Sequence, residues 1–218
     1  MDLAYWWPVL WTGTLDTIYM VGVSALFTIV LGLPLGVLLV ITDRNGLSPR
    51  PVLYAVLGAF VNAARSLPFI ILLVLIVPFT RLVVGTTIGA TAAIVPLAVS
   101  AIPFFARVAE ASLREVDRGL VEAAQAMGCT LWQTITRVMI PEALSSLILG
   151  VAITIISLIG YSAMAGAIGG GGLGDLAIRY GYQRYETEVM LVTVVLLIAL
   201  VQGIQWLGNR VARNFSRR

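Results

Sequence analysis

Apolar runs long enough to cross a lipid bilayer recur along this chain, and no other feature constrains its fold as strongly. A helix needs roughly 20 apolar residues to traverse a hydrocarbon core of about 30 Å. Hydrophobic residues make up 59% of the 218 residues and charged residues only 11%, whereas about a quarter of a soluble domain is charged. We therefore predict an all-α, multi-pass membrane protein in which residues 1–218 form one transmembrane domain.

Short polar connections separate the runs, so the sequence predicts five membrane spans. Their expected boundaries are residues 18–41, 58–79, 88–106, 144–165 and 189–207. Pro96 and Pro103 predict kinks in the third span, because proline removes a helical hydrogen bond. An arginine at mid-bilayer costs about 2.5–3.5 kcal/mol, so we expect Arg65 to lie near an interface or to face the protein interior.

The N-terminal segment carries aromatic side chains ahead of the first run: Tyr5, Trp6, Trp7 and Trp11. Amphipathic rings of this kind settle at a membrane–water boundary, which predicts an interfacial anchor. Met1-Asp2 places no basic segment before the apolar stretch, so we do not expect a cleaved signal peptide here.

The arginines predict how the spans are oriented. Lysine and histidine are absent, so the net charge of +3 comes from arginines alone. Those on alternate connections are Arg44 and Arg50, then Arg107, Arg114, Arg118 and Arg137, then Arg210, Arg213, Arg217 and Arg218; the intervening connections hold only Arg81, and Arg179 with Arg184. Cytoplasmic loops carry the excess of arginine. We therefore expect the N-terminus outside, the C-terminus in the cytoplasm, and a cytoplasmic loop over residues 107–142.

The composition argues against several classes of function. Without histidine, and with Cys129 as the only cysteine, the usual zinc sets and nucleophile–base pairs cannot be assembled. We therefore expect no catalytic residue, no metal site and no cofactor bound by this chain, and no basic face for a nucleic acid. A secondary transporter usually needs ionisable groups within its spans, and the five predicted spans contain no acidic residue, so we keep that class only as a weaker alternative.

The loop over residues 107–142 shows helical periodicity. Apolar residues recur in it at steps of three and four, namely Leu113, Val116, Leu120, Ala124 and Met127. This spacing predicts one amphipathic helix that docks by its apolar face. Gly128 suits a left-handed cap at the end of that helix. Thr130 and Gln133 fit a capping box that opens a second helix through Val138.

Pro141 and Glu142 favour the first turn of the helix that follows, because proline lacks a donor there and a carboxylate suits the positive end of the helix dipole. The helix, glycine and second helix would then form an elbow tied to the fourth span. The residues alone leave two interpretations open. The elbow could be a solvated connector, or a rigid element that transmits the motion of a soluble partner.

Within this loop the sequence resembles the EAA motif of bacterial ABC importer permeases. The matching residues are Glu122-Ala123-Ala124, Gly128, and Val138-Met139-Ile140-Pro141, at the family's spacing of three and nine residues. Val138 and Ile140 stand where the family usually has isoleucine and leucine. The resemblance implies that Glu122 through Gly128 form a coupling helix seated in a groove of an ATP-binding subunit, with Pro141 closing the motif.

A wider resemblance covers nearly the whole chain and points to the methionine-uptake branch of this family. It rests on segments such as Arg65-Ser66-Leu67-Pro68-Phe69, Tyr161-Ser162-Ala163-Met164 and Gly170-Gly171-Gly172-Leu173-Gly174. It implies a homodimer in the bacterial inner membrane, two ATP-binding subunits that carry ATP and Mg²⁺, and an external substrate-binding lipoprotein. D- and L-methionine would cross by alternating access at the dimer interface. The alternative is an importer for another small solute, such as a quaternary amine or a phosphonate.

Two further segments are candidate sites. Met164 is similar in position to an apolar gate residue of the family, with Tyr161 and Ser162 beside it. The small residues near these positions allow close packing of helices, or they place the fourth span at a two-fold axis. The glycine run, Gly170, Gly171, Gly172 and Gly174, lacks the Gly-Lys-Ser/Thr ending of a phosphate loop. It is either a flexible or close-packed external turn, or a contact surface for the substrate-binding protein.

Overall fold

The computed structural model describes residues 3–215, with side chains from residue 6 onward. Arg217 and Arg218, which entered the prediction of orientation, lie outside the described residues. So do Met1 and Asp2, which entered the expectation about a signal peptide, and the side chain of Tyr5. Every regular element between residues 3 and 215 is a helix. This confirms the predicted all-α class.

The helices vary widely in length. In chain order they are α1 (Leu3–Thr42), α2 (Pro51–Ser66), α3 (Phe69–Leu75), α4 (Val77–Val84), α5 (Ala90–Arg114), α6 (Arg118–Ala126), α7 (Leu131–Thr134), the π-helix η1 (Ile135–Met139), α8 (Ile140–Glu142), α9 (Leu144–Ala165), the π-helix η2 (Gly166–Gly170), α10 (Gly172–Leu176), the π-helix η3 (Ala177–Tyr182) and α11 (Thr187–Phe215). Four of the described helices, α1, α5, α9 and α11, are long and apolar enough to cross a membrane. The bent pair of α2 and α3 makes a fifth if it is counted as one span.

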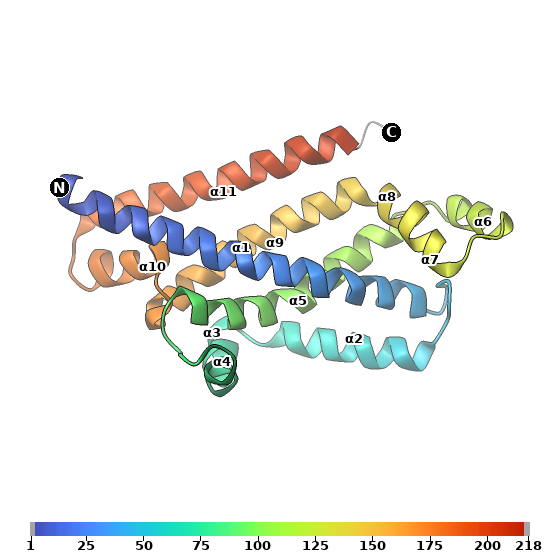
Figure 1. The fold of residues 1–218 in the computed structure, drawn as a ribbon, viewed down its shortest axis with the longest axis horizontal. Coiled ribbons are helices and arrows are strands. Elements are labelled where there is room, and N and C mark those ends of the chain that lie inside the picture. The colour runs from blue at the N-terminus through green and yellow to red at the C-terminus, as the bar shows by residue number, and fades with distance from the viewer. Residues whose placement is uncertain (1–2, 216–218) are drawn as a thin grey trace.

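The long helices run lengthwise through the molecule, and the connections collect at its two ends (Figure 1). The described start of α1 and the short helix α10 lie at one end. The turn between α1 and α2, the helices α6, α7 and α8, and the end of α11 lie at the other. The arginine-rich connections therefore share one end of the bundle, as the charge pattern requires. Which end faces the cytoplasm stays a prediction.

The second predicted span, residues 58–79, is not one helix. The axes of α2 and α3 meet at 100°. Leu67 between them is extended, with φ −79° and ψ 123°, because the proline that follows it disfavours helical geometry at the preceding residue. The segment therefore bends sharply after Ser66, and α4 continues from α3 after one further break at Ile76.

The helix of the third predicted span, residues 88–106, ends later than expected. α5 continues through Pro96 and Pro103 to Arg114, so residues 107–114 are two further helical turns rather than the start of a loop. α1 and α11 likewise extend beyond their predicted ranges. The bounds of α9 coincide with the predicted fourth span.

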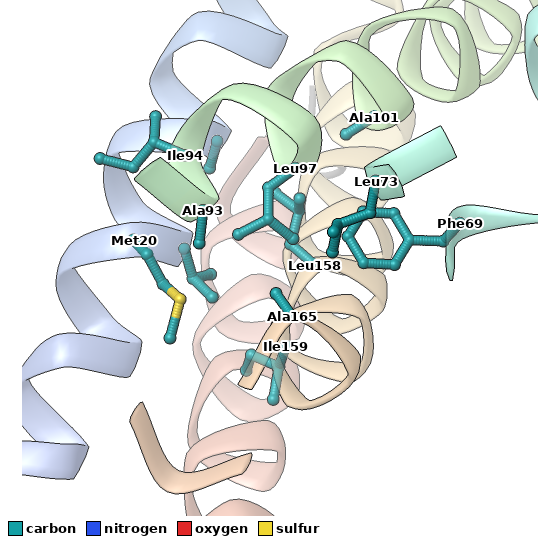
Figure 2. Close-up of a cluster of buried hydrophobic side chains, with 12 residues drawn as sticks. Met20, Phe69, Leu73, Ala93, Ile94, Leu97, Ala101, Leu158, Ile159 and Ala165 are labelled. Atoms are coloured by element: carbon teal, nitrogen blue, oxygen red, sulfur yellow. The ribbon is translucent and has the colours of Figure 1, made fainter. Parts of the chain in front are cut away.

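The main apolar core lies where α1, α3, α5 and α9 meet (Figure 2). Met20, Leu97 and Leu158 are fully buried there, and α3 adds Phe69 and Leu73. Outside this core, large apolar side chains on α2, α4 and α11 remain exposed. Apolar surface on this scale marks contact with a membrane or with another protein.

Candidate functional site

The elbow comprises residues 118–142, and its first helix starts later than the periodicity predicts. α5 ends at Arg114 and α6 begins at Arg118, so the expected single helix from Leu113 is broken. The break has a local cause, because Asp117 caps α6 with a carboxylate Oδ1 that accepts a hydrogen bond from the Gly119 amide at 2.7 Å. Such caps are typical of helix starts.

The bend of the elbow is built as predicted. Gly128 has φ +79°, a left-handed conformation that glycine adopts without a steric penalty. The capping box at the next helix is complete, with the Gln133 amide donating to Thr130 Oγ1 at 3.3 Å and the Thr130 amide donating to Gln133 Oε1 at 2.8 Å. These two devices confirm the helix–glycine–helix geometry.

Two backbone hydrogen bonds join the elbow to α9 across Ala143, the residue between α8 and α9. The Ala143 amide donates to Met139 O at 3.0 Å, and the Leu147 amide donates to Ala143 O at 2.9 Å. Pro141 and Glu142 occupy the first turn of α8, as expected. Ile135 and Met139 are buried against α5 in the apolar cluster at this end. The elbow is therefore a packed element and not a solvated connector.

The elbow leaves a defined surface exposed. Ala124 is 1% exposed and faces the protein, whereas Glu122 and Ala123 are exposed. Met127, Leu131 and Trp132 are 77%, 42% and 73% exposed, and we call these three the elbow tip. Unlike the exposed apolar side chains along the spans, the elbow tip lies among the arginine-rich connections, where apolar exposure indicates a protein contact.

The gate candidates divide into two environments near the far end of α9. Met164 is 48% exposed. The Tyr161 ring is half-buried and stacks on Phe69, with centroids 4.8 Å apart and planes at 12°. Ser162 is buried and donates to Ile159 O at 2.8 Å, so its hydroxyl is already paired and does not share the exposed face with Met164.

One face of α9 has no partner within the described chain. Ile153 and Met164 are exposed on it, and Gly160 lies between them with nothing within 4 Å of the position that a Cβ would take. The spacing of seven and four residues places all three on one side of the helix. A helix that is otherwise packed thus presents an open apolar stripe, which we call the α9 stripe.

The glycine run folds back against the bundle. Gly170, Gly172 and Gly174 are buried and Gly171 is partly buried. A Cβ on Gly172 would stand 2.4 Å from Met20 Cε, and the next amide, of Leu173, donates to the buried Thr17 Oγ1 at 2.9 Å. The run is therefore a close-packed turn, and three of its four candidate contact residues offer no exposed side.

Charged side chains follow this turn. The hydrogen bond from Arg179 Nε to Asp175 Oδ1 is 3.2 Å long, and it raises the pKa of the Arg179 guanidinium above its ordinary value. Arg184 lies over the Tyr180 ring at 4.9 Å. These exposed arginines supply the polar surface that the buried glycines lack.

A charged cluster around one buried carboxylate on α5 was not predicted. Glu110 is 4% exposed and pairs with Arg107 at 2.6 Å and with Arg114 at 2.8 Å. The signal was present in the spacing, because charges three and four residues apart share one face of a helix. Assigning residues 107–142 to a loop hid it.

Comparison with known proteins agrees with the resemblance to ABC importer permeases. Residues 29–218 match the family described as "binding-protein-dependent transport system inner membrane component". The probable D-methionine transport system permease protein MetI of Vibrio cholerae serotype O1 is 51% identical over 220 residues, which cover 99% of this chain and 98% of that protein. The methionine import system permease protein MetP of Bacillus subtilis is 43% identical, covering 96% of this chain and 94% of its own.

A solved structure gives the same result in three dimensions. A chain of the MetNI methionine ABC transporter in an inward-facing conformation superposes with a TM-score of 0.97 at 48% identity, and each chain is covered completely. The match includes the elbow, the bent second span and the glycine turn, since it extends over all residues. The chain therefore belongs to the binding-protein-dependent transport system inner membrane components, and it is a permease subunit of an ABC importer.

Proposed function

We propose that two copies of this chain form the translocation path of an inner-membrane ABC importer for D- and L-methionine. The observation that carries the proposal is likeness along the whole chain to relatives and a solved transporter that are named for methionine. ATP and Mg²⁺ would bind to the partner subunits. This chain would supply the path for the solute and the contact with the ATP-binding subunit.

The α9 stripe supports a path between two copies. A small helical bundle encloses little space of its own, and closed two-fold assemblies are the commonest oligomers. Facing copies of α9 would bring together two exposed Met164 side chains, with the half-buried Tyr161 rings beside them. Such a lining is mostly apolar and suits a thioether side chain, because weak contacts allow the solute to leave.

The elbow supports coupling to an ATP-binding subunit. Glu122, Ala123 and the elbow tip are exposed together at one end of the molecule, while Gly128 and Pro141 fix the bend and its junction with α9. ATP-driven closure of the partner would draw the two elbows together and shift the population from inward-open to outward-open.

An external binding protein would dock at the opposite end, beside the glycine turn. Gly170, Gly172 and Gly174 would act there by shaping a tight turn, with Gly171 nearest to the surface. Arg179 and Arg184 would supply contacts, because exposed charges steer association more than they add affinity.

The test is uptake by proteoliposomes of the complex with its ATP-binding subunits and binding protein. Labelled D- and L-methionine should accumulate only with ATP, and a quaternary amine or a phosphonate should not compete. Gly128→Pro and Glu122→Arg should abolish uptake, whereas Gln205→Ala on α11 should not. Accumulation of a quaternary amine instead, or full uptake with Glu122→Arg, would contradict the proposal.

A further inference from the structure

The helix α2 has little apolar attachment to the rest of the chain. Its buried residues are only Gly58 and Val61. Val52, Val56 and Phe60 on the same helix are 77%, 61% and 67% exposed. Helices in lipid are held together by close packing and by hydrogen bonds between them. Since α2 packs few residues against the rest of the chain, polar contacts must supply much of its attachment.

Polar groups of α5 supply that attachment around one buried carboxylate. Glu110 Oε2 accepts a hydrogen bond from Arg107 at 2.6 Å. Its Oε1 accepts from Arg114 at 2.8 Å and from the Tyr54 hydroxyl of α2 at 3.3 Å. A carboxylate removed from water is stable only when its oxygens are paired in this way.

Arg107 extends the attachment along α2. One of its terminal nitrogens donates to Gly58 O at 3.1 Å and to Asn62 Oδ1 at 3.0 Å. Together with Tyr54, these contacts fall at steps of four residues, so they line one face of α2 over two turns. We call this group, Arg107, Glu110 and Arg114 with Tyr54 and Asn62, the α2–α5 pin.

The pin also reaches the elbow. Arg114 is the last residue of α5 and pairs with Asp43 at 3.0 Å in the turn that joins α1 to α2. Asp43 and Arg114 line a cavity of about 320 Å³ together with Arg118 and Glu122 of α6. Three residues join Arg114 to the start of α6, so a displacement of α6 would reach this end of the pin through the backbone.

The far end of α2 leads to the gate candidates. After the 100° bend, α3 begins with Phe69, whose ring stacks on Tyr161 of α9. The connection thus runs along the backbone from α6 to Arg114, through the hydrogen bonds of Glu110 and Tyr54 to α2, and along the backbone to Phe69. Coupling between distant sites is carried by packed and hydrogen-bonded elements that move as units.

From this geometry we infer that Glu110 is a positioning residue for transport, which makes α2 follow the elbow when an ATP-binding subunit moves it. The inference rests on the proposed coupling role of the elbow. If hydrogen bonds of the pin were lost, the ATP-binding subunit would still hydrolyse ATP. The helix α2 and the Phe69–Tyr161 contact would no longer move with the elbow. The expected signature is a lower ratio of solute transported to ATP hydrolysed, which a purely structural role would not produce.

The experiment compares Glu110→Gln and Tyr54→Phe in the complete complex reconstituted in proteoliposomes. We expect uptake per ATP hydrolysed to fall about tenfold for Glu110→Gln and about threefold for Tyr54→Phe, within the range of known coupling mutations. Hydrolysis and recovery of the complex should stay near those of the unmodified protein. Glu110→Asp, which keeps the charge, should restore most of the ratio.

Glu115→Gln is the matched control, since Glu115 lies one residue beyond α5 and is exposed. Among the described residues, its carboxylate accepts a hydrogen bond only from Ser146, at 3.1 Å. It should leave the ratio unchanged. If Glu110→Gln lowers the yield of complex, Tyr54→Phe decides, because it removes a single hydroxyl. An unchanged ratio in Tyr54→Phe, or an equal fall in uptake and hydrolysis, would overturn the inference. The ratio is measured with whichever solute the unmodified complex transports, so failure of the methionine proposal remains distinguishable.

Discussion

Gly174 lies against Ala163, so close that a Cβ on Gly174 would stand 2.3 Å from the Ala163 Cα. Real Cβ atoms do not approach backbone so closely, and backbone cannot yield as a flexible side chain can. This contact seats α10 on the end of α9 and so fixes the glycine turn beside the gate candidates.

Gly174→Ala should therefore destabilise the protein by about 1–3 kcal/mol, the usual cost of overpacking a filled site. Thermal unfolding of the purified protein in detergent measures it. Gly203→Ala on α11 is the matched control, because it adds the same methyl group to a helical glycine with nothing within 4 Å. Equal melting temperatures for the two variants would contradict the prediction.

Gly128→Ala should strain the elbow without a clash. The φ of +79° costs a residue with a Cβ about 1–2 kcal/mol, while no atom lies within 4 Å of the new methyl group. Faster hydrogen exchange in α6 and α7 should report the strain. Gly128→Asn should exchange more slowly than Gly128→Ala, since asparagine tolerates the left-handed region, and the reverse order would refute the explanation.

Trp132→Ala should weaken the association with the ATP-binding subunit by about 2 kcal/mol, roughly 30-fold in Kd, as is usual for a tryptophan at the centre of an interface. Trp206→Ala on α11 is the control, because its ring is 61% exposed, close to the 73% of Trp132, but belongs to a membrane-crossing helix. Binding measured in detergent should separate the two. Similar losses for both variants would mean that the elbow tip is not the contact.

Gly160→Leu should prevent two copies of α9 from meeting, because a large side chain would stand on the open stripe. The fold of the single chain should not change, since nothing within it occupies that space. Native mass spectrometry should find fewer dimers, and uptake should fall about tenfold or more, as small residues at helix contacts in lipid cannot be enlarged without loss. Gly203→Leu on α11, equally open, should keep both dimer and uptake.

Local signals predicted the elements that local interactions build. The bounds of α9, the left-handed Gly128 and the Thr130–Gln133 capping box follow from residues within a few positions of one another. The sharp bend after Ser66 was different. Pro68 explains a bend at this point, but the angle of 100° cannot be read from it, since α3 packs Phe69 and Leu73 into a core supplied by other helices.

The candidate site was predictable only where it depends on local interactions. Counting charges assigned Arg107 to a loop. Its pairing with Glu110 could have been read from their spacing, but its bonds to α2 could not be read from its neighbours in sequence. The glycine run was ambiguous because its packing depends on Thr17, more than 150 residues away. The elbow motif needed no such long-range information.

If the elbow moves as proposed, the unbroken α9 acts as a lever. Its 22 residues span about 33 Å at 1.5 Å per residue, so a tilt of about 10° at the elbow end would swing the other end by about 6 Å. Met164 lies at that far end. A motor that shifts the elbow by a few ångströms could thus open or shut an aperture wide enough for one amino acid, without bending any helix.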